Sequence, residues 1–277
     1  MEKPLIGLKR NTIDKYYTKK NIVEECISLI KDNIDISNED LIIEPSAGNG
    51  SFIDFIMSLS KNYLFYDIDP EHNTITKQDY LKLDTNILKK DNKIHVIGNP
   101  PFGRQSSQAR KFIKKSCKFC DTLSFILPKS FKKESLKKTF PLNFHLKYQW
   151  DLPINSFLID NIEHDVPCVF QIWIKEEFER KTKPSLKPIN YKFVNKSENP
   201  EISFRRVGVN AGKISEEIDN KSEQSHYFIK FTNKNNENTV KNHLEKLKKL
   251  KFNFDNTVGA KSISKQELIE QMNNLID

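Results

Sequence analysis

The chain has 277 residues, 37% of them hydrophobic and 30% charged, so it can bury a substantial core and is expected to be soluble. It has no apolar run of the roughly 20 residues that a membrane span needs, no apolar leader after Met1, and only four scattered cysteines. These features predict a cytoplasmic protein and argue against an integral membrane protein. The net charge is +8, and residues 181–277 hold 18 Lys and Arg against 12 Asp and Glu. This excess indicates a polyanionic partner, with a solvated lysine-rich surface as the alternative.

The N-terminal region predicts a helix that follows a polar segment. Apolar residues recur at helical spacing from Ile22 to Ile30, and Thr18 or Asn21 is the expected cap. Tyr17 and Thr18 would then lie at a helix N-terminus, where backbone N–H groups favour a negatively charged group such as a carboxylate.

The first strand signal, at residues 41–44, runs into a turn of small residues, Pro45-Ser46-Ala47-Gly48-Asn49-Gly50. Apolar residues at helical spacing follow, so strand, turn and helix form the front half of a Rossmann-like unit. The turn lacks the lysine of a phosphate loop, and no GxGxxG pattern is present. A turn of this kind beside an acidic strand end suits a zwitterionic nucleoside better than a triphosphate.

Polar side chains follow two further strand signals. Residues 63–66 predict a strand that ends at Asp67, where a carboxylate can accept both hydroxyls of a ribose, and Asp79 comes a short way on. Val96 and Ile97 predict a buried strand that ends at Asn99-Pro100-Pro101-Phe102, because two prolines cannot extend a ladder. Since ligands bind at the carboxyl ends of strands in open α/β sheets, these side chains are candidates for one site.

The rest of the chain predicts alternating helices and strands up to an antiparallel pair, and then a smaller α+β region. Expected helices lie at 106–118, from 134 to before 141, at 237–250 and at 263–276; expected strands lie at 123–128, 145–150, 167–174, 191–194, 202–207 and 226–231. A loop over 151–164 could fold over a pocket, and residues 181–188 look like a linker. We therefore expect one domain at 1–180 and a basic substrate-binding segment at 181–277.

Five of these segments resemble the motifs of amino methyltransferases that use S-adenosylmethionine, especially N6-adenine methyltransferases of DNA. The matching segments are Tyr16-Tyr17-Thr18, Glu44 to Phe52, Asp67-Ile68-Asp69-Pro70, Gln78-Asp79-Tyr80 and Asn99-Pro100-Pro101-Phe102. The resemblance covers residues 11–175. It implies an α/β fold with a Rossmann-like class I methyltransferase sheet, mostly parallel with an antiparallel final hairpin, and a small C-terminal α+β extension.

The resemblance also implies roles for individual residues. A flipped adenine would donate hydrogen bonds from its N6 amine to the Asn99 side-chain oxygen and the Pro100 carbonyl. Its ring would stack on Phe102, and Phe157 resembles the second aromatic of that clamp. S-adenosylmethionine would be the cofactor, with Tyr17 and Thr18 at its methionyl end, Asp67 at its ribose and Asp79 at its adenine amine. The full implied cofactor set is Tyr17, Thr18, Glu44, Pro45, Ala47, Gly48, Asn49, Gly50, Asp67, Ile68, Asp79, Tyr80 and Asn99, and Pro101 completes the catalytic motif.

Several alternatives stay open. The substrate could be RNA, although the Tyr-Tyr-Thr motif favours DNA, or glutamine in a protein; the chain could also be a non-catalytic nucleic-acid-binding subunit. The C-terminal segment is expected to bind substrate through basic residues such as Arg205 and Arg206, but it is short for a full recognition domain. A partner subunit or a homodimer therefore stays open. We expect no metal, since Cys117 and Cys120 have zinc spacing but lack a second ligand pair.

Overall fold

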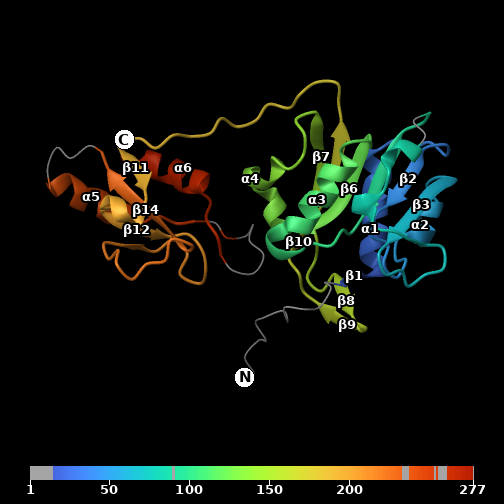
Figure 1. Ribbon diagram of the computed structural model, residues 1–277, viewed down its shortest axis with the longest axis horizontal. Helices are drawn as coiled ribbons and strands as arrows, with labels where there is room; N and C mark the ends of the chain where they lie inside the picture. The colour runs from blue at the N-terminus through green and yellow to red at the C-terminus, as the bar shows by residue number, and fades with distance from the viewer. Residues whose placement is uncertain (1–14, 89–90, 233–236, 253, 255–260, 277) are drawn as a thin grey trace. The chain divides into compact units, whose positions relative to one another are not determined.

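The computed structural model describes residues 15–88, 91–232, 237–252, 254 and 261–276 (Figure 1). The chain forms two compact units: unit 1 runs to Lys181 and unit 2 begins at Thr182. Within the described ranges, no helix is long and apolar enough to cross a membrane.

Unit 1 is built on a seven-stranded sheet with the order β4-β3-β2-β5-β6-β10-β7. Its strands are β2 (Leu41–Glu44), β3 (Asn62–Asp67), β4 (Thr76–Lys77), β5 (Ile94–Gly98), β6 (Thr122–Pro128), β7 (Phe144–Asp151) and β10 (Cys168–Lys175). Neighbouring strands from β4 to β6 pair in parallel, whereas β10 is antiparallel to both β6 and β7. This is the Rossmann-like sheet with an antiparallel final hairpin that the sequence predicted, and the fold class is confirmed.

Helices cover both faces of this sheet. Successive residues of a strand point to opposite faces, so apolar residues of one strand can pack against helices on both sides. Ile42 and Ile97 pack with α1 and α2 in one core, whereas Ile43 and Val96 pack with α3 in the other. The helices of unit 1 are α1 (Lys20–Asn33), α2 (Ile53–Met57), α3 (Ser107–Ser116) and α4 (Glu134–Lys137), joined by the short 3₁₀ turns η1 (Tyr80–Lys82), η2 (Thr85–Ile87), η3 (Arg104–Ser106) and η4 (Lys129–Lys132). The central strands β2, β5, β6 and β10 are thus buried on both faces over most of their length, as is typical of parallel sheets.

The chain order of the strands places a crevice at one edge of the sheet. After β3 and β4, which lie on one side of β2, the chain crosses to β5 on the other side of β2. Loops that leave β2 and β5 at their carboxyl ends therefore turn away from each other, which is where open α/β sheets bind ligands. Glu44 ends β2 and Asn99 follows β5, so both lie at this switch point.

Two local predictions in unit 1 are wrong. The residue that caps α1 is Lys19, which makes no side-chain capping bond. Thr18 lies instead in the short strand β1 (Tyr17–Thr18), where its hydroxyl accepts a hydrogen bond from Asn99. The segment 151–164 is not simply a loop: β8 (Phe157–Ile159) and β9 (Ile162–His164) form a hairpin, and β8 pairs with β1.

Unit 2 is an antiparallel sheet covered by helices, with the strand order β11-β14-β12-β13. Its elements are β11 (Tyr191–Val194), η5 (Lys196–Glu198), β12 (Ile202–Arg205), β13 (Ile214–Ser215), β14 (His226–Phe231), α5 (Glu237–Leu247) and α6 (Lys265–Ile276). Phe204 and Ile229 of the sheet pack with Leu247, Leu268 and Met272 of the helices. The predicted small α+β extension is confirmed.

Candidate active site

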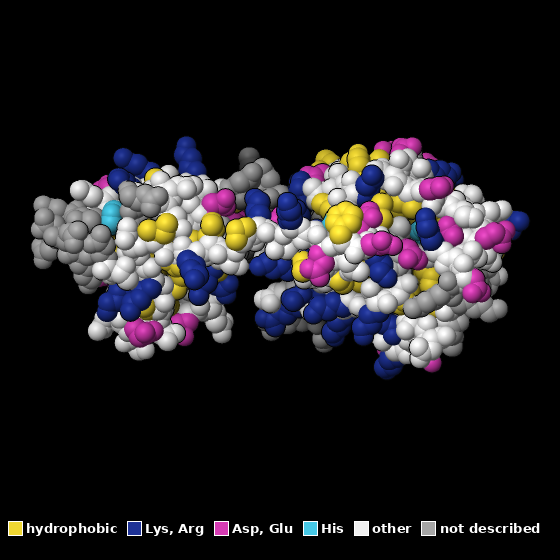
Figure 2. All heavy atoms as spheres, turned by 90° about the horizontal axis from the view of Figure 1, so that it is seen from above, with side chains coloured by type: hydrophobic (Ala, Val, Ile, Leu, Met, Phe, Trp, Pro, Cys, Tyr) yellow, Lys and Arg dark blue, Asp and Glu magenta, His cyan; other side chains and the backbone are white. Residues whose placement is uncertain are grey.

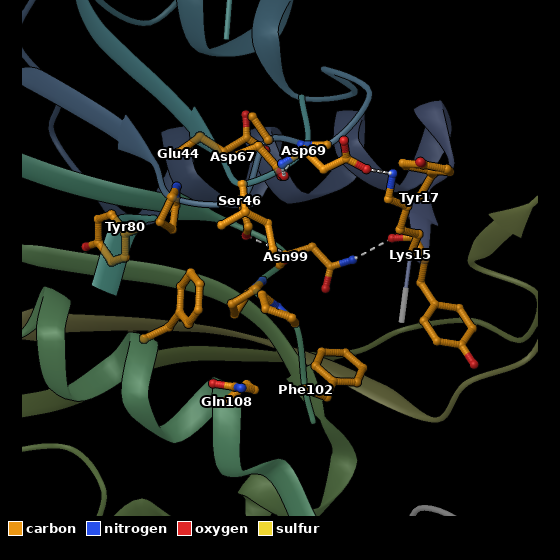
Figure 3. A pocket seen from close by; sticks show the side chains of 18 of the residues that line it. Lys15, Tyr17, Glu44, Ser46, Asp67, Asp69, Tyr80, Asn99, Phe102 and Gln108 are labelled. Atoms are coloured by element: carbon orange, nitrogen blue, oxygen red, sulfur yellow. Dashed lines mark hydrogen bonds and ion pairs between the residues drawn. The ribbon is translucent and has the colours of Figure 1, made fainter. Parts of the chain in front are cut away.

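A pocket of about 500 Å³ opens at the carboxyl edge of the unit 1 sheet. Its lining comes from residues 15–18, 44–49, 51–52, 67–69, 79–81, 99–103, 108 and 112. In Figure 3, Asn99 lies at the centre, with Glu44, Asp67 and Asp69 on one side and Phe102 and Gln108 on the other. The structure therefore brings together residues from five of the predicted segments.

The Asn99 side chain is held in one orientation. Its Nδ2 donates to the Tyr16 carbonyl oxygen at 3.2 Å and to the Thr18 hydroxyl at 3.3 Å. The Ser46 hydroxyl donates to the Asn99 backbone oxygen at 3.2 Å. Asn99 Oδ1 is buried and has no hydrogen-bond partner among the residues that the structure describes. An unsatisfied buried acceptor costs free energy, so the pocket presents one oxygen that is ready for an external N–H donor.

The turn after β2 positions the Asp67 carboxylate. Gly48 has φ +53°, and a Cβ there would lie 3.3 Å from the Tyr17 ring, so glycine allows the close approach of strand, turn and ring. Gly48 N donates to Asp67 Oδ2 and Asp69 N donates to Oδ1, both at 2.8 Å. A carboxylate oxygen can accept more than one hydrogen bond, so Asp67 keeps acceptor capacity for a diol.

Tyr17 is held by an ionic cluster on the pocket rim, two members of which, Lys15 and Glu71, the sequence motifs did not indicate. Its hydroxyl donates to Glu71, while Lys15 Nζ bonds Asp69 at 2.6 Å and Glu71 at 2.8 Å. Burial and the Glu71 hydrogen bond raise the pKa of Tyr17 to about 12, so its phenol stays protonated. The partners are more than 50 residues apart in the chain, and only folding brings them together.

The segment around Asp79 forms another wall. Asp79 caps η1 by accepting a hydrogen bond from Leu81 N at 3.0 Å. The Tyr80 hydroxyl bonds Ser116 Oγ at 2.7 Å, and its ring stacks on Phe112, so Tyr80 contributes ring surface and no free polar group. Ile68 is 56% exposed, although it is apolar and lines the pocket.

The predicted role of Phe157 is wrong. Phe157 is fully buried in the core, in the strand β8 that lies beside β1, and does not line the pocket. Pairing of β8 with β1 places Phe157 opposite Thr18 and under Tyr16, whose ring meets it edge-on at 6.2 Å. Tyr16, in turn, lines the pocket together with Phe102. Tyr16 is therefore a better candidate than Phe157 for the second aromatic ring of the predicted clamp. Its position beside Tyr17 and Thr18 in the sequence could have indicated this.

Other predicted residues lie at the edge of the pocket or away from it. Asn49 lines the pocket but uses its Oδ1 to accept hydrogen bonds from Ser51, and Gly50 does not belong to the lining. Arg205 and Arg206 lie in unit 2, where Arg205 donates to the Val207 carbonyl oxygen and Arg206 to that of Gln224.

No metal centre is apparent where the structure is described, since no three His, Cys, Asp or Glu side chains are grouped to hold an ion. The four cysteines are free and buried. Cys117 and Cys120 belong to the core beside α3.

Two further pocket oxygens lack a partner within the described part of the chain, Glu44 Oε2 and Gln108 Oε1. Together with Asn99 Oδ1 they make three buried acceptors in one pocket, and Gln108 is the one that the sequence motifs did not indicate. Asp67, Asp69 and Asp79 outnumber Lys15 in the lining, so the pocket favours a ligand with positive charge and several N–H or O–H donors. S-adenosylmethionine, with its sulfonium, ammonium, ribose diol and adenine amine, fits this donor and charge requirement.

Comparisons with known proteins place the chain in a family. A search of curated proteins found no match. Among solved structures, the chain is similar to protein PH1948 of Pyrococcus horikoshii, with 19% identity and a TM-score of 0.44 over 62% of this chain and 93% of that one. It is also similar to an rRNA methylase from Streptococcus thermophilus, with 15% identity and a TM-score of 0.38 over 56% of this chain and 95% of that one. The model of the EDM2 methyltransferase-like domain matches residues 36–184, more than half of the chain. The chain therefore belongs to the EDM2 methyltransferase-like domain family.

Proposed function

We propose that the chain transfers a methyl group from S-adenosylmethionine to the N6 amine of an adenine in nucleic acid, with DNA as the substrate. The observation that carries this proposal is the fixed Asn99 carboxamide, whose Oδ1 is buried in the pocket without a partner among the described residues. Family membership supports methyl transfer in general, and the adenine amine is inferred from the Asn-Pro-Pro-Phe segment.

The chemistry follows from the electronic structure of an aromatic amine. The N6 lone pair is delocalised into the purine ring, so the amine is a weak nucleophile. Asn99 Oδ1 and the Pro100 carbonyl oxygen would accept its two N–H groups and favour a pyramidal nitrogen with a localised lone pair. Positioning and electrostatics of this kind need no group with a tuned pKa.

Bound S-adenosylmethionine supplies an electrophilic methyl group on a positively charged sulfur. The target nitrogen would bond to this carbon as the carbon–sulfur bond breaks and the thioether leaves, and the methylated amine would lose one proton to solvent. Asp67 would hold the ribose and Asp79 the adenine amine of the cofactor. Tyr17, fixed by Glu71, would close the pocket over the Gly48 turn.

A base must leave its helix to reach this pocket, and aromatic rings commonly receive it. Phe102 is half-buried and lines the pocket beside Asn99, with Tyr16 close to the Asn99 amide. We infer that Phe102 and Tyr16 form the two walls for the target base.

We also propose that unit 2 contributes to holding nucleic acid. Lys and Arg side chains are visible on the surface of both units (Figure 2), and the excess of basic residues is concentrated in 181–277. Nucleic-acid affinity comes largely from neutralising phosphates with such side chains. A need for a partner subunit or a second copy of the chain remains part of this proposal.

The test is transfer of tritium from labelled S-adenosylmethionine to unmethylated duplex DNA and, in parallel, to unmodified total RNA, followed by nucleoside analysis. We expect N6-methyladenine in DNA with the native chain. Asn99→Ala should lose transfer by about 10²-fold or more while it still binds cofactor, because it removes the acceptor that localises the lone pair.

Asn62→Ala is the matched control, since Asn62 is exposed and its side chain donates to the Glu39 carbonyl oxygen, away from the pocket. Label in RNA alone would move the substrate to RNA. Cofactor binding with no label in either pool would contradict the proposed nucleic-acid substrate, and transfer that survives in Asn99→Ala would contradict the proposed mechanism.

A further inference from the structure

Glu44 is an unusual residue to find inside the pocket, because the described part of the chain places no cation in an ion pair with its carboxyl group. It ends β2 and is only 2% exposed, and its Oε2 has no hydrogen-bond partner among the described residues. Gly98 leaves room for it: a Cβ at Gly98 would lie 3.2 Å from Glu44 Cγ. Moving an ionised carboxylate into such a place is unfavourable unless a partner compensates its charge.

The charged groups around Glu44 do not compensate it. Asp67, from the adjacent strand β3, repels a negative charge on Glu44. Gly98 of β5 lies against the Glu44 side chain, and Ser46 and Asn99 line the same pocket; none of the three carries a charge. The cation of the described lining is Lys15, and Lys15 is already paired with Asp69 and Glu71.

These surroundings favour the neutral form of Glu44. Burial, and then the charge of Asp67, raise the pKa of Glu44 to about 8. At neutral pH its carboxyl group is therefore mostly protonated. A positive charge brought into the same enclosure would favour the carboxylate, since opposite charges attract strongly where water is excluded.

We propose that Glu44 loses its proton to solvent when the sulfonium cofactor enters the pocket, and that the carboxylate formed there selects the cationic methyl donor over the neutral thioether product. The step is an acid dissociation: the O–H bond of the carboxyl group breaks, the electron pair stays on the oxygen, and buffer takes the proton. This inference rests on the proposed use of S-adenosylmethionine and assigns a specificity-determining role to Glu44.

The test is calorimetric titration of the full chain with S-adenosylmethionine at pH 7, in phosphate and in Tris, whose ionisation enthalpies differ. The difference in apparent enthalpy between the buffers, divided by the difference in their ionisation enthalpies, gives the number of protons released. We expect close to one proton per bound cofactor with the native chain and fewer with S-adenosylhomocysteine, which differs in lacking the sulfonium charge. Glu44→Gln has no acidic proton at this position, so it should lose the proton release that Glu44 provides in the native chain.

Selectivity gives a second readout from the same titrations. The Kd for S-adenosylhomocysteine divided by the Kd for S-adenosylmethionine should fall by about tenfold in Glu44→Gln, because the charge that distinguishes the two ligands is gone. Asp54→Asn is the matched control: Asp54 is an exposed acid in α2 outside the pocket, and it should leave both readouts unchanged.

A third measurement needs no variant. For the native chain, the Kd for S-adenosylmethionine should fall by about tenfold from pH 6 to pH 7, and the Kd for S-adenosylhomocysteine should fall less. Binding of S-adenosylmethionine with no proton release and no such pH dependence would overturn the role of Glu44 but leave the proposed function standing. Failure of the native chain to bind S-adenosylmethionine at all would overturn both.

Discussion

At the scale of single residues, Phe102 and Phe157 show how two similar side chains take unrelated places. Phe102 follows two prolines after β5 and lines the pocket, whereas Phe157 is fully buried in β8 beside β1. Both phenylalanines follow a turn, and the local sequence does not predict which of the two rings lines the pocket. The pairing of β8 with β1, across about 140 residues of chain, decides which ring faces a ligand.

We expect substitution to separate these two places. Phe157→Ala should lower the free energy of unfolding by about 3–5 kcal/mol, because it leaves a cavity in the core. Phe102→Ala should cost less stability but reduce methyl transfer about tenfold or more, because base stacking is worth roughly 1–3 kcal/mol. Urea denaturation together with the tritium assay measures both effects. Equal stability losses with unchanged transfer in Phe102→Ala would contradict the assignment of the pocket wall.

At the scale of elements, a buried polar chain ties β5 to both neighbouring strands at the edge of the sheet opposite the pocket. His95 of β5 is fully buried, its Nε2 lies 3.2 Å from Asp40 beside β2, and its Nδ1 lies 2.8 Å from Thr122 Oγ1 of β6. Asp40 also accepts hydrogen bonds from Ser37 N and Lys93 N. These contacts anchor the amino ends of the strands whose carboxyl ends carry the site.

This chain of contacts makes stability depend on pH. Burial lowers the pKa of His95, although Asp40 opposes the shift. The unfolded chain therefore binds a proton more readily, so the stability contribution is complete above about pH 6.5 and is lost as pH falls below it. Burial opposes ionisation of Asp40, but hydrogen bonds from Ser37 and His95 outweigh it and lower the pKa of this carboxyl, so its contribution is lost only below about pH 4.

We expect the native chain to lose several degrees of Tm between pH 7 and pH 5 through His95, whereas His95→Gln, which cannot titrate, should lose less over this interval. Differential scanning calorimetry at the two pH values measures the change. His72→Gln is the control, since His72 is exposed. Parallel Tm losses in all three proteins would show that His95 does not carry this dependence.

At the scale of the whole molecule, two units with separate cores share one chain. Unit 1 contains the pocket, and unit 2 contains much of the excess positive charge that the composition shows. Arg206 lies over the Tyr227 ring at 5.4 Å, and Arg205 lies against Gly208, so both guanidinium groups also stabilise unit 2 locally. A test of substrate binding therefore has to separate the effect of losing the positive charge from the effect of losing these local contacts.

We expect Arg205→Ala with Arg206→Ala to weaken DNA binding and to lower the slope of log affinity against log salt by up to about 2, because each arginine would neutralise one phosphate. The paired change of both residues to Lys keeps the charge and serves as the control. Fluorescence anisotropy over a salt series measures the slope, and thermal melting checks that unit 2 stays folded. Affinity and slope unchanged in the Ala variant would remove both residues from the proposed interface.

The sequence by itself determined the sheet, the helices on its faces and the segments at its carboxyl edge, because these follow from short-range patterns. Apolar periodicity sets strands and helices, and the prolines after Asn99 and the glycine at position 48 set turns that only such residues allow. Tertiary structure alone decided which residues of distant segments become neighbours in and around the pocket. It brought Glu71 to Tyr17 and Gln108 into the pocket and buried Phe157 in the core. It also left Glu44 Oε2 without a hydrogen-bond partner among the described residues. Each of these depends on contacts between distant segments, and a residue's burial and charge neighbours exist only once those segments have packed.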